Sequence, residues 1–183
     1  ENTNHTNGLA FDAEGRLYGC CSGGRSIVRF ESDGSMTTIV DSLDGQPLNT
    51  PNDLAIDRQD RIWFSNPWNA GNIDPSEKQV NPQKDILRAD PQPDGTWTCQ
   101  RMTFDTTGSN GLLISPDQRS LYMIQSDSEP GGIRELRSYP IQDDGSLGQY
   151  IVLHQFPTDH RGHQRGIDGM CLDAEGNIIA TAG

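Results

Sequence analysis

The chain has 183 residues, a formal net charge of −12 and 32% hydrophobic residues. Such acidity argues against a nucleic-acid groove, because phosphate binding needs clustered lysine and arginine. The sequence has no run of about 18 apolar residues, so no membrane-spanning helix is predicted. Acidity suits the binding of cations, although it more often only keeps a protein in solution. The composition leaves open whether the protein is cytoplasmic or exported.

The first 40 residues predict one four-stranded unit. Short runs rich in β-forming residues cover 9–11, 17–21, 26–30 and 36–40. Glycine-containing turns separate these runs, which is typical of antiparallel up-and-down sheets. We therefore expect a small sheet whose strands are adjacent in chain order.

Two similar units and the beginning of another follow. The second unit is expected to combine strands at 54–56, 62–65, 86–89 and 96–104; the third, strands at 112–114, 121–125, 134–139 and 150–155; and a last strand is expected at 178–181. No segment shows sustained helical periodicity, so the predicted fold class is all-β.

The segment 66–84 interrupts the second unit. It is polar and contains three prolines, which predicts a long loop. Loops of this length in compact domains are often lids or binding elements, and an insertion that is merely tolerated is the alternative.

One short motif opens each unit. Its copies begin at Asn7, Asn52, Asn110 and Asp168, about 45 to 58 residues apart, as expected for repeated four-stranded units. A β-propeller closes with four to eight blades, and this chain supplies about three and a half. We therefore interpret residues 1–183 as part of one propeller domain and expect a fragment of a longer chain. Its unpaired edges and apolar faces would make the fragment marginally stable or prone to aggregate.

The motif also places oxygen-bearing side chains at equivalent positions. In a radial fold, Asn52, Asn110 and Asp168 would point toward one axis. Carboxylate and amide oxygens suit Ca²⁺ or Mg²⁺ and can also accept Zn²⁺ or Mn²⁺. Three ligands are too few for a tight Ca²⁺ site, so a further carboxylate, water or substrate is needed. The alternative is that these side chains only cap turns through bonds to the backbone.

Apolar residues of the motif are expected to pack between the blades. They are Leu9, Phe11, Leu54, Ile56, Leu112, Ile114, Met170 and Leu172. The cysteines Cys20, Cys21, Cys99 and Cys171 show no C-x-x-C spacing, which argues against zinc-ribbon and thioredoxin-like sites. Adjacent Cys20 and Cys21 would point to opposite faces of a strand, so we expect buried free thiols.

Several longer motifs occur in one order along the chain: Leu48-Asn49-Thr50-Pro51-Asn52-Asp53-Leu54, Arg61-Ile62-Trp63-Phe64-Ser65, Ser109-Asn110-Gly111-Leu112, and the segment from Asp168-Gly169-Met170 to Gly176. From about Asn7 to Gly183 the chain resembles the gluconolactonase family, also called the SMP-30 or regucalcin-like family. The resemblance implies a six-bladed propeller that hydrolyses sugar lactones with a divalent cation, Ca²⁺ above all, in its central tunnel. It implies that Asn110 and Asp168 are metal ligands, and that Asn52 belongs to the same metal site and touches substrate or bound water.

Two features depart from the family pattern. The remaining ligand of the family is a Glu in an E-G-P motif of the first blade, which would lie upstream of this chain, so we expect the chain to hold only part of the site. The sequence Phe64-Ser65-Asn66 stands where the family usually has F-T-D, which puts one carboxylate near the tunnel in doubt.

The leading hypothesis is therefore a metal-dependent lactone hydrolase. Asp168 would bind the metal and help to take the proton of an attacking water, while Asn52 and Asn110 orient substrate and metal. Arg165 would bind sugar hydroxyls or a product carboxylate, with His160 and His163 nearby, unless these three residues belong to a solvated loop.

Other activities find less support in the sequence. The chain lacks a G-x-S-x-G nucleophile elbow and the G-x-G-x-x-G and Walker loops of nucleotide sites. The alternatives are a non-catalytic propeller that binds a protein partner, and a propeller enzyme of another type, such as a strictosidine-synthase-like protein. The oligomeric state stays open.

Overall fold

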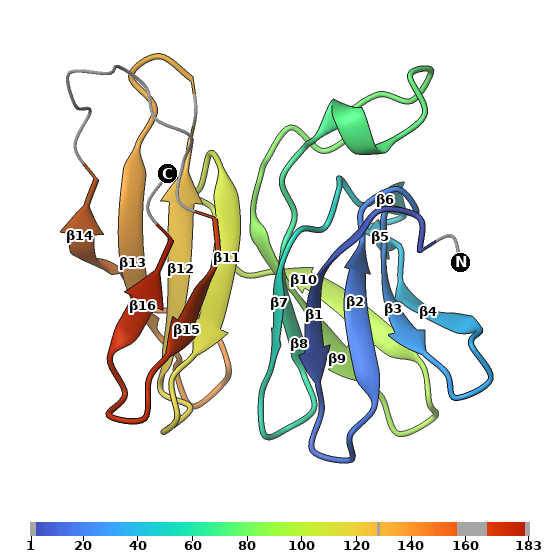
Figure 1. Cartoon of the computed structure of the whole chain (residues 1–183), viewed down its shortest axis with the longest axis horizontal. Coiled ribbons are helices and arrows are strands. Elements are labelled where there is room, and N and C mark those ends of the chain that lie inside the picture. Colours follow the sequence, from blue (N-terminus) through green and yellow to red (C-terminus); the bar gives the residue numbers. More distant parts are fainter. Residues whose placement is uncertain (1–2, 128, 157–167, 182–183) are drawn as a thin grey trace.

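The computed structural model describes residues 3–127, 129–156 and 168–181 (Figure 1). Within these residues, three four-stranded antiparallel sheets follow one another along the chain, and a two-stranded sheet comes last. The strands of each of these sheets are adjacent in chain order, as the turn pattern predicts. The described part of the chain contains no helix long and apolar enough to cross a bilayer.

The observed strands agree closely with the predicted runs. The first sheet contains β1 (Thr6–Phe11), β2 (Leu17–Cys21), β3 (Ser26–Phe30) and β4 (Met36–Val40). The second contains β7 (Leu54–Ile56), β8 (Ile62–Ser65), β9 (Ile86–Pro91) and β10 (Trp97–Arg101). The third contains β11 (Ser109–Ile114), β12 (Ser120–Ser126), β13 (Arg134–Pro140) and β14 (Ile151–Gln155), and the last pairs β15 (Met170–Leu172) with β16 (Ile178–Ala180).

Two small elements were not expected from the sequence. A short hairpin of β5 (Ser42–Leu43) and β6 (Gln46–Pro47) links the first two sheets, and the 3₁₀ turn η1 (Ala70–Asn72) lies in the long loop of the second unit. Both are too short to give a periodic sequence signal.

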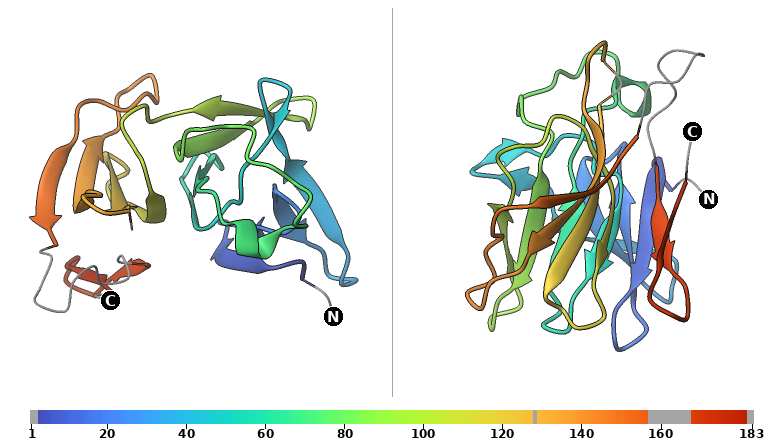
Figure 2. Two further views of the ribbon diagram at one scale, coloured as in Figure 1. Left: turned by 90° about the horizontal axis from the view of Figure 1, so that it is seen from above. Right: turned by 90° about the vertical axis from the view of Figure 1, so that its left-hand side faces the viewer.

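The sheets are arranged as an open arc. Figure 2 shows, from above, the first and last sheets at the two ends of the arc with the second and third between them. The first strand of each sheet lies on the inside: β7 contacts both β1 and β11, and β11 contacts β15. This radial order of sheets is that of consecutive propeller blades.

One side-chain pattern fixes the hairpin between the first two strands of each sheet. The Oδ1 atoms of Asp12, Asp57 and Asp173 each accept hydrogen bonds of 2.8–3.0 Å from the backbone N–H groups two and four residues later. In the third sheet the hydroxyl of Ser115 accepts from residues four and five positions later instead. The repeated Asp of the motif therefore serves the turn, by a local side-chain to backbone bond.

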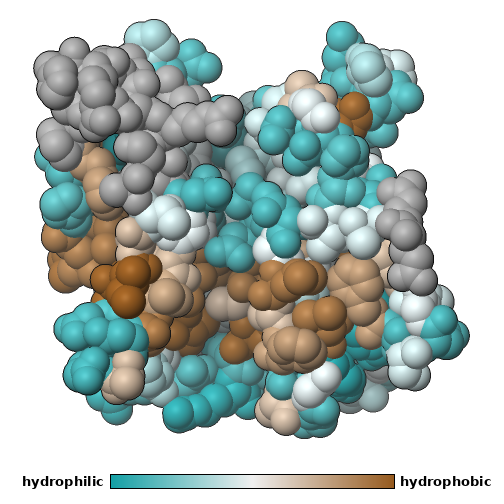
Figure 3. Space-filling view, in the orientation of Figure 1, coloured by the Kyte–Doolittle hydropathy of each residue, from teal (hydrophilic) through white to brown (hydrophobic). Residues whose placement is uncertain are grey.

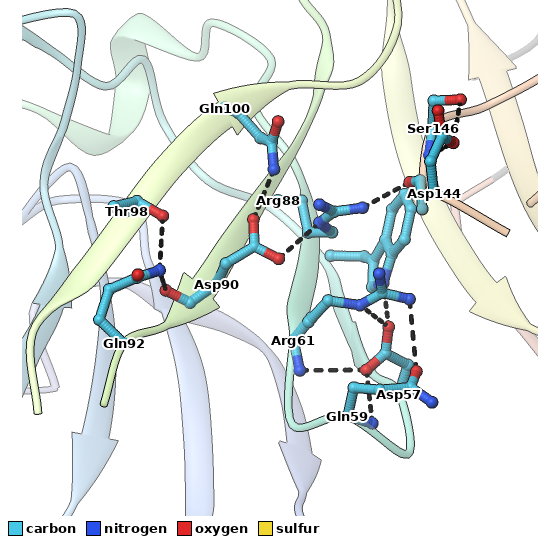
Figure 4. Close-up of polar contacts among 12 residues, drawn as sticks. Asp57, Gln59, Arg61, Arg88, Asp90, Gln92, Thr98, Gln100, Asp144 and Ser146 are labelled. Atoms are coloured by element: carbon cyan, nitrogen blue, oxygen red, sulfur yellow. Dashed lines mark hydrogen bonds and ion pairs between the residues drawn. The ribbon is translucent and has the colours of Figure 1, made fainter. Parts of the chain in front are cut away.

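Asp57 also joins this turn to the core between the second and third sheets. Its Oδ2 accepts hydrogen bonds from Arg61 Nε at 2.6 Å and from the indole of buried Trp63 at 2.8 Å. Arg88 lies over the same ring, 4.9 Å from its centroid, and donates from Nη1 to the carbonyl of Gly145 in the third sheet (Figure 4). Arg88 thus links the second sheet to the turn between β13 and β14 of the third.

Apolar clusters fill the spaces between neighbouring sheets. Leu54 and Ile56 pack toward the first sheet, and Leu112 and Ile114 pack toward the second. Met170 packs against Ile124 and Leu136 of the third sheet. The prediction that these motif residues lie between blades is confirmed for these positions.

The same prediction is wrong for Leu9 and Phe11, whose exposed fractions are 54% and 67%. Since motif residues face the preceding sheet, these two side chains face a side on which the described chain has no sheet. Figure 3 shows hydrophobic surface over β1 and again over the last strands. The exposed residues there include Ile151 and Ile179. Both ends of the arc therefore leave apolar surface in water.

The expectation of buried free thiols is confirmed in part. Cys20 and Cys21 are buried, Cys99 is partly buried, and all four cysteines are free. Cys171, in contrast, is exposed. Cys171 pairs with Ile179 across β15 and β16 and, like it, lies on the side away from the third sheet.

Candidate active site

Neighbouring sheets touch through the backbone at the start of their inner strands. The N–H of Gly8 donates to the carbonyl of Asn52 at 2.8 Å, and the N–H of Gly111 donates to the carbonyl of Asp168 at 2.9 Å. A Cβ atom at Gly8 would lie 2.6 Å from Asp53 Cα, and one at Gly111 would overlap the Asp168 carbonyl. Glycine is required at these two positions because the backbones approach so closely.

Asp53 occupies the equivalent position between the second and third sheets. Its Oδ1 accepts from the N–H of Leu54 at 2.9 Å, and its Oδ2 accepts from the N–H of Leu112 at 3.2 Å. The carboxylate therefore bridges β7, which follows Asn52, and β11, which contains Asn110. Burial raises the pKa of Asp53, and the negative charge of Asp168 adds to that rise.

Our sequence reasoning did not single out Asp53. A signal was nevertheless present, because the other three motif copies have glycine at this position: Gly8, Gly111 and Gly169. Asp53 stands where the other copies have glycine, at the start of an inner strand. Its side chain therefore has a role beyond the backbone contact that glycine allows at the other copies.

Asn52 and Asn110 line one hollow of about 260 Å³ between the second and third sheets. The second sheet and its long loop supply Pro67, Trp68, Asn69 and Lys84; the third sheet supplies Gly108, Ser109, Ser126 and Asp127. The wall is mostly polar. The structure therefore brings two of the three predicted site residues together in one recess.

Asp168 lies beside this recess. Its carbonyl accepts from Gly111, the residue that follows Asn110, and its side chain is exposed. Its charge acts on Asp53, which is bonded to both inner strands. Three other residues expected near the site, Arg165, His160 and His163, lie outside the described residues.

The side chains of Asn52, Asn110 and Asp168 make no hydrogen bond within the part of the chain that the structure describes. This is unlike Asp12 and Asp57, whose carboxylates hold turns. Turn capping, the alternative interpretation of the trio, is therefore not what these side chains do.

The amide oxygen of Asn110 is buried and has no hydrogen-bond partner. A buried acceptor left unpaired costs about 1–3 kcal/mol. Two amide oxygens and a nearby carboxylate form a donor set that suits a hard cation. Among the described residues no group of three or more His, Cys, Asp or Glu side chains could hold a metal, so such a site would be rich in amides. These residues fit a divalent cation.

Lys84 adds a positive charge to the recess. It precedes Ile86 by two residues on the approach to β9, and Ile86 packs between the second and third sheets. Strand alternation places residues two apart on the same face, so Lys84 lies on the side of the recess. Its ammonium group makes no ion pair with another described residue. This lysine suits an anionic group on a ligand.

The departure at Asn66 marks a second polar cluster behind the recess. Asn66 is fully buried, and neither polar atom of its amide has a partner. Its neighbour across the sheet, Asp85, is also fully buried, with Arg101 Nε 2.9 Å from Oδ2 but no well-directed hydrogen bond to either oxygen. Burial raises the pKa of Asp85 to about 6, against the opposing charge of Arg101.

This burial predicts a pH dependence of stability. The folded pKa of about 6 exceeds the ordinary pKa of 3.8 that Asp85 has in an unfolded chain, so the folded state binds more protons between these values. Stability should then fall as pH rises from about 4 to about 6, by up to about 3 kcal/mol at about 1.4 kcal/mol per pKa unit. In denaturant melts of the full-length protein, Asp85→Asn should remove this part of the slope. Exposed Asp143→Asn serves as the control, and an unchanged slope in Asp85→Asn would contradict the assignment.

Comparison with known proteins identifies the family. A family model described as the SMP-30/Gluconolactonase/LRE-like region matches residues 1–183. The chain belongs to this family. The resemblance inferred from the motifs is therefore confirmed.

Individual relatives agree with this membership. A gluconolactonase from Zymomonas mobilis is 27% identical over 184 aligned positions, which cover 97% of this chain and 49% of the relative. A solved gluconolactonase from Xanthomonas campestris superposes with a TM-score of 0.79 at 33% identity, covering 97% of this chain and 56% of that one. A luciferin-regenerating enzyme, at 19% identity and a TM-score of 0.64, supports the fold alone. The prediction of an all-β propeller fold is confirmed, and the chain spans about half the length of these relatives.

Proposed function

We propose that the protein to which this chain belongs hydrolyses a sugar lactone with the help of a divalent cation, Ca²⁺ in the first place, with Zn²⁺, Mn²⁺ or Mg²⁺ as alternatives. One observation carries the proposal: the unpartnered, buried amide oxygen of Asn110 lies in the same recess as Asn52, in a chain of the gluconolactonase family. Asn52, Asn110 and Asp168 are the proposed ligands.

A bound cation would supply Lewis-acid polarisation of the lactone carbonyl and a more acidic water. The side chains of the protein orient the substrate and take part in proton transfer. The amides of Asn52 and Asn110 orient the lactone through their oxygens and N–H groups. Asp53, by joining β7 and β11, holds the two amides at a fixed separation. Asp168 takes part in the transfer of the water proton, as a weak base when its charge is shared with a cation.

Ring opening of a lactone produces a carboxylate. Lys84 lies in the recess and carries a charge that attracts this group as it forms. Arg165, predicted for the same purpose, remains a proposal from the sequence. The substrate that we propose is thus a small polyhydroxylated lactone, and the product an open-chain acid.

The proposal is tested by metal-dependent turnover. The full-length protein, freed of metal with a chelator, should lose hydrolysis of aldonolactones, measured by proton release, and recover it when Ca²⁺, Zn²⁺ or Mn²⁺ is added. Absence of turnover with every metal, from protein shown to be folded, would favour the non-catalytic binding module. Turnover that survives the chelator unchanged would contradict the role of the cation.

A further inference from the structure

The loop between β8 and β9, residues 66–84, extends from the second sheet toward the first (Figure 1). Both of its ends are tied to one side chain: Asn49 Nδ2 donates to the carbonyl of Asn66 at 3.2 Å and to that of Gln83 at 2.9 Å. Asn49 is fully buried. Asn49 lies in the segment that links the first two sheets, so this segment holds the two ends of the loop together.

A second contact fixes the residues next to the recess. The hydroxyl of Thr50 donates to the carbonyl of Pro67 at 2.8 Å and accepts from the N–H of Asn69 at 2.8 Å. Trp68 lies between these two bonded residues. Because Pro67, Trp68 and Asn69 all line the recess, Thr50 sets the backbone position of that wall.

Arg25 of the first sheet holds the side chains of the loop. Its Nε donates to the carbonyl of Leu48 at 2.6 Å, and its Nη1 donates to Glu77 at 2.8 Å. Its guanidinium carbon lies 5.5 Å from the centroid of the Trp68 ring. One side chain thus joins the linker, the far part of the loop and the aromatic residue at the recess.

The backbone conformation of Arg25 is unfavourable, so its contacts must offset a conformational cost. Its φ is +50°, in the left-handed region that a residue with a side chain seldom adopts, and 8% of the residue is exposed. A buried arginine is stable when its donors are used and its charge is paired. Glu77 and the Trp68 ring offset its charge, and both belong to the loop, while Nη2 is buried without a hydrogen-bond partner among the described residues.

We propose that Arg25 is a positioning residue, which holds the 66–84 loop as a fixed wall of the recess so that Trp68 limits the ring substituents a lactone substrate can carry. The inference rests on the proposed function for its substrate and on the described contacts for its geometry. An aromatic ring packs against the C–H face of a sugar ring and excludes bulky groups from that side. Trp68, in the loop of the second sheet, then limits the size of the substrate, and Arg25 of the first sheet holds Trp68 in place.

The test uses Arg25→Met in the full-length protein, with exposed Arg119→Met as the matched control. Glu77→Gln is a milder variant, since 41% of the Glu77 side chain is exposed and its loss threatens folding less. Two measurements are made on each. The first is the rate of tryptic cleavage after Lys78, an exposed loop residue, and it needs no substrate. The second is KM and kcat for lactones that differ in the size of one ring substituent.

We expect cleavage after Lys78 to accelerate about tenfold in Arg25→Met, and less in Glu77→Gln, because Arg25→Met removes the hydrogen bond to the Leu48 carbonyl, the ion pair with Glu77 and the contact with the Trp68 ring. KM for the smallest lactone should rise about tenfold with kcat little changed, and the preference for small lactones should shrink. Unchanged cleavage and unchanged KM in both variants overturn the proposal. If the wild-type protein hydrolyses no lactone while the variants are cleaved faster, the positioning role stands and the proposed function fails.

Discussion

Replacing Asp168 by alanine in the full-length protein should abolish both metal binding and lactone turnover. Asp168 is the proposed carboxylate ligand, and its carbonyl is bonded to Gly111, next to Asn110. Removing it leaves, of the ligands proposed in this chain, only two neutral amides, which bind a hard cation weakly. We expect turnover to fall at least about 100-fold, the scale for loss of one group that stabilises developing charge. Calorimetric titration with Ca²⁺ and proton-release kinetics measure the two effects separately.

Two further variants sharpen this result. Asp168→Asn keeps an oxygen but removes the charge, so metal affinity should drop while the fold is retained. Asp143→Ala removes an exposed aspartate from a hairpin turn of the third sheet and should leave affinity and turnover at the wild-type level. Full activity in Asp168→Ala, with the control also active, would contradict the assignment of the site.

Much of this fold follows from local sequence patterns. The turn aspartates, such as Asp57, satisfy backbone N–H groups within four residues, so both the hairpin and its sequence signal are local. The inner strand residues Leu54 and Leu112 hold the same position of the repeated motif and are buried as predicted. The same pattern failed at Leu9 because burial of a blade face depends on the neighbouring blade, which no local pattern records.

The candidate site was only partly visible in the sequence. Asn52 and Asn110 share a motif position, and the radial fold brings them to one recess as expected. Asp53, Lys84 and Trp68 reach the same region through contacts between sheets, and their roles depend on which strand lies beside them. Arg25 is 43 residues from Trp68 in the chain, and no motif connects them. Residues fixed by the repeat can be predicted, whereas residues brought in by packing of neighbouring units cannot.

The second large effect is expected at Asn110. Its unpaired, buried oxygen costs free energy in the absence of a ligand. Asn110→Ala should therefore leave the metal-free full-length protein as stable as the wild type, or make it more stable. With Ca²⁺ at 100 times its dissociation constant, the wild type should gain about 2.7 kcal/mol of stability, whereas the variant at the same concentration should gain almost none.

A matched control separates this role from the motif itself. Asn7 begins the same motif in the first sheet, is exposed and does not line the recess, so Asn7→Ala should keep the metal-induced gain. Thermal melts with and without Ca²⁺ provide the comparison. If Asn110 only supports the fold, Asn110→Ala should lose the same stability with and without metal, since packing or a structural bond would be missing in both states. Loss confined to the metal-bound state identifies the Asn110 oxygen as a ligand, because only the free energy of binding depends on metal concentration.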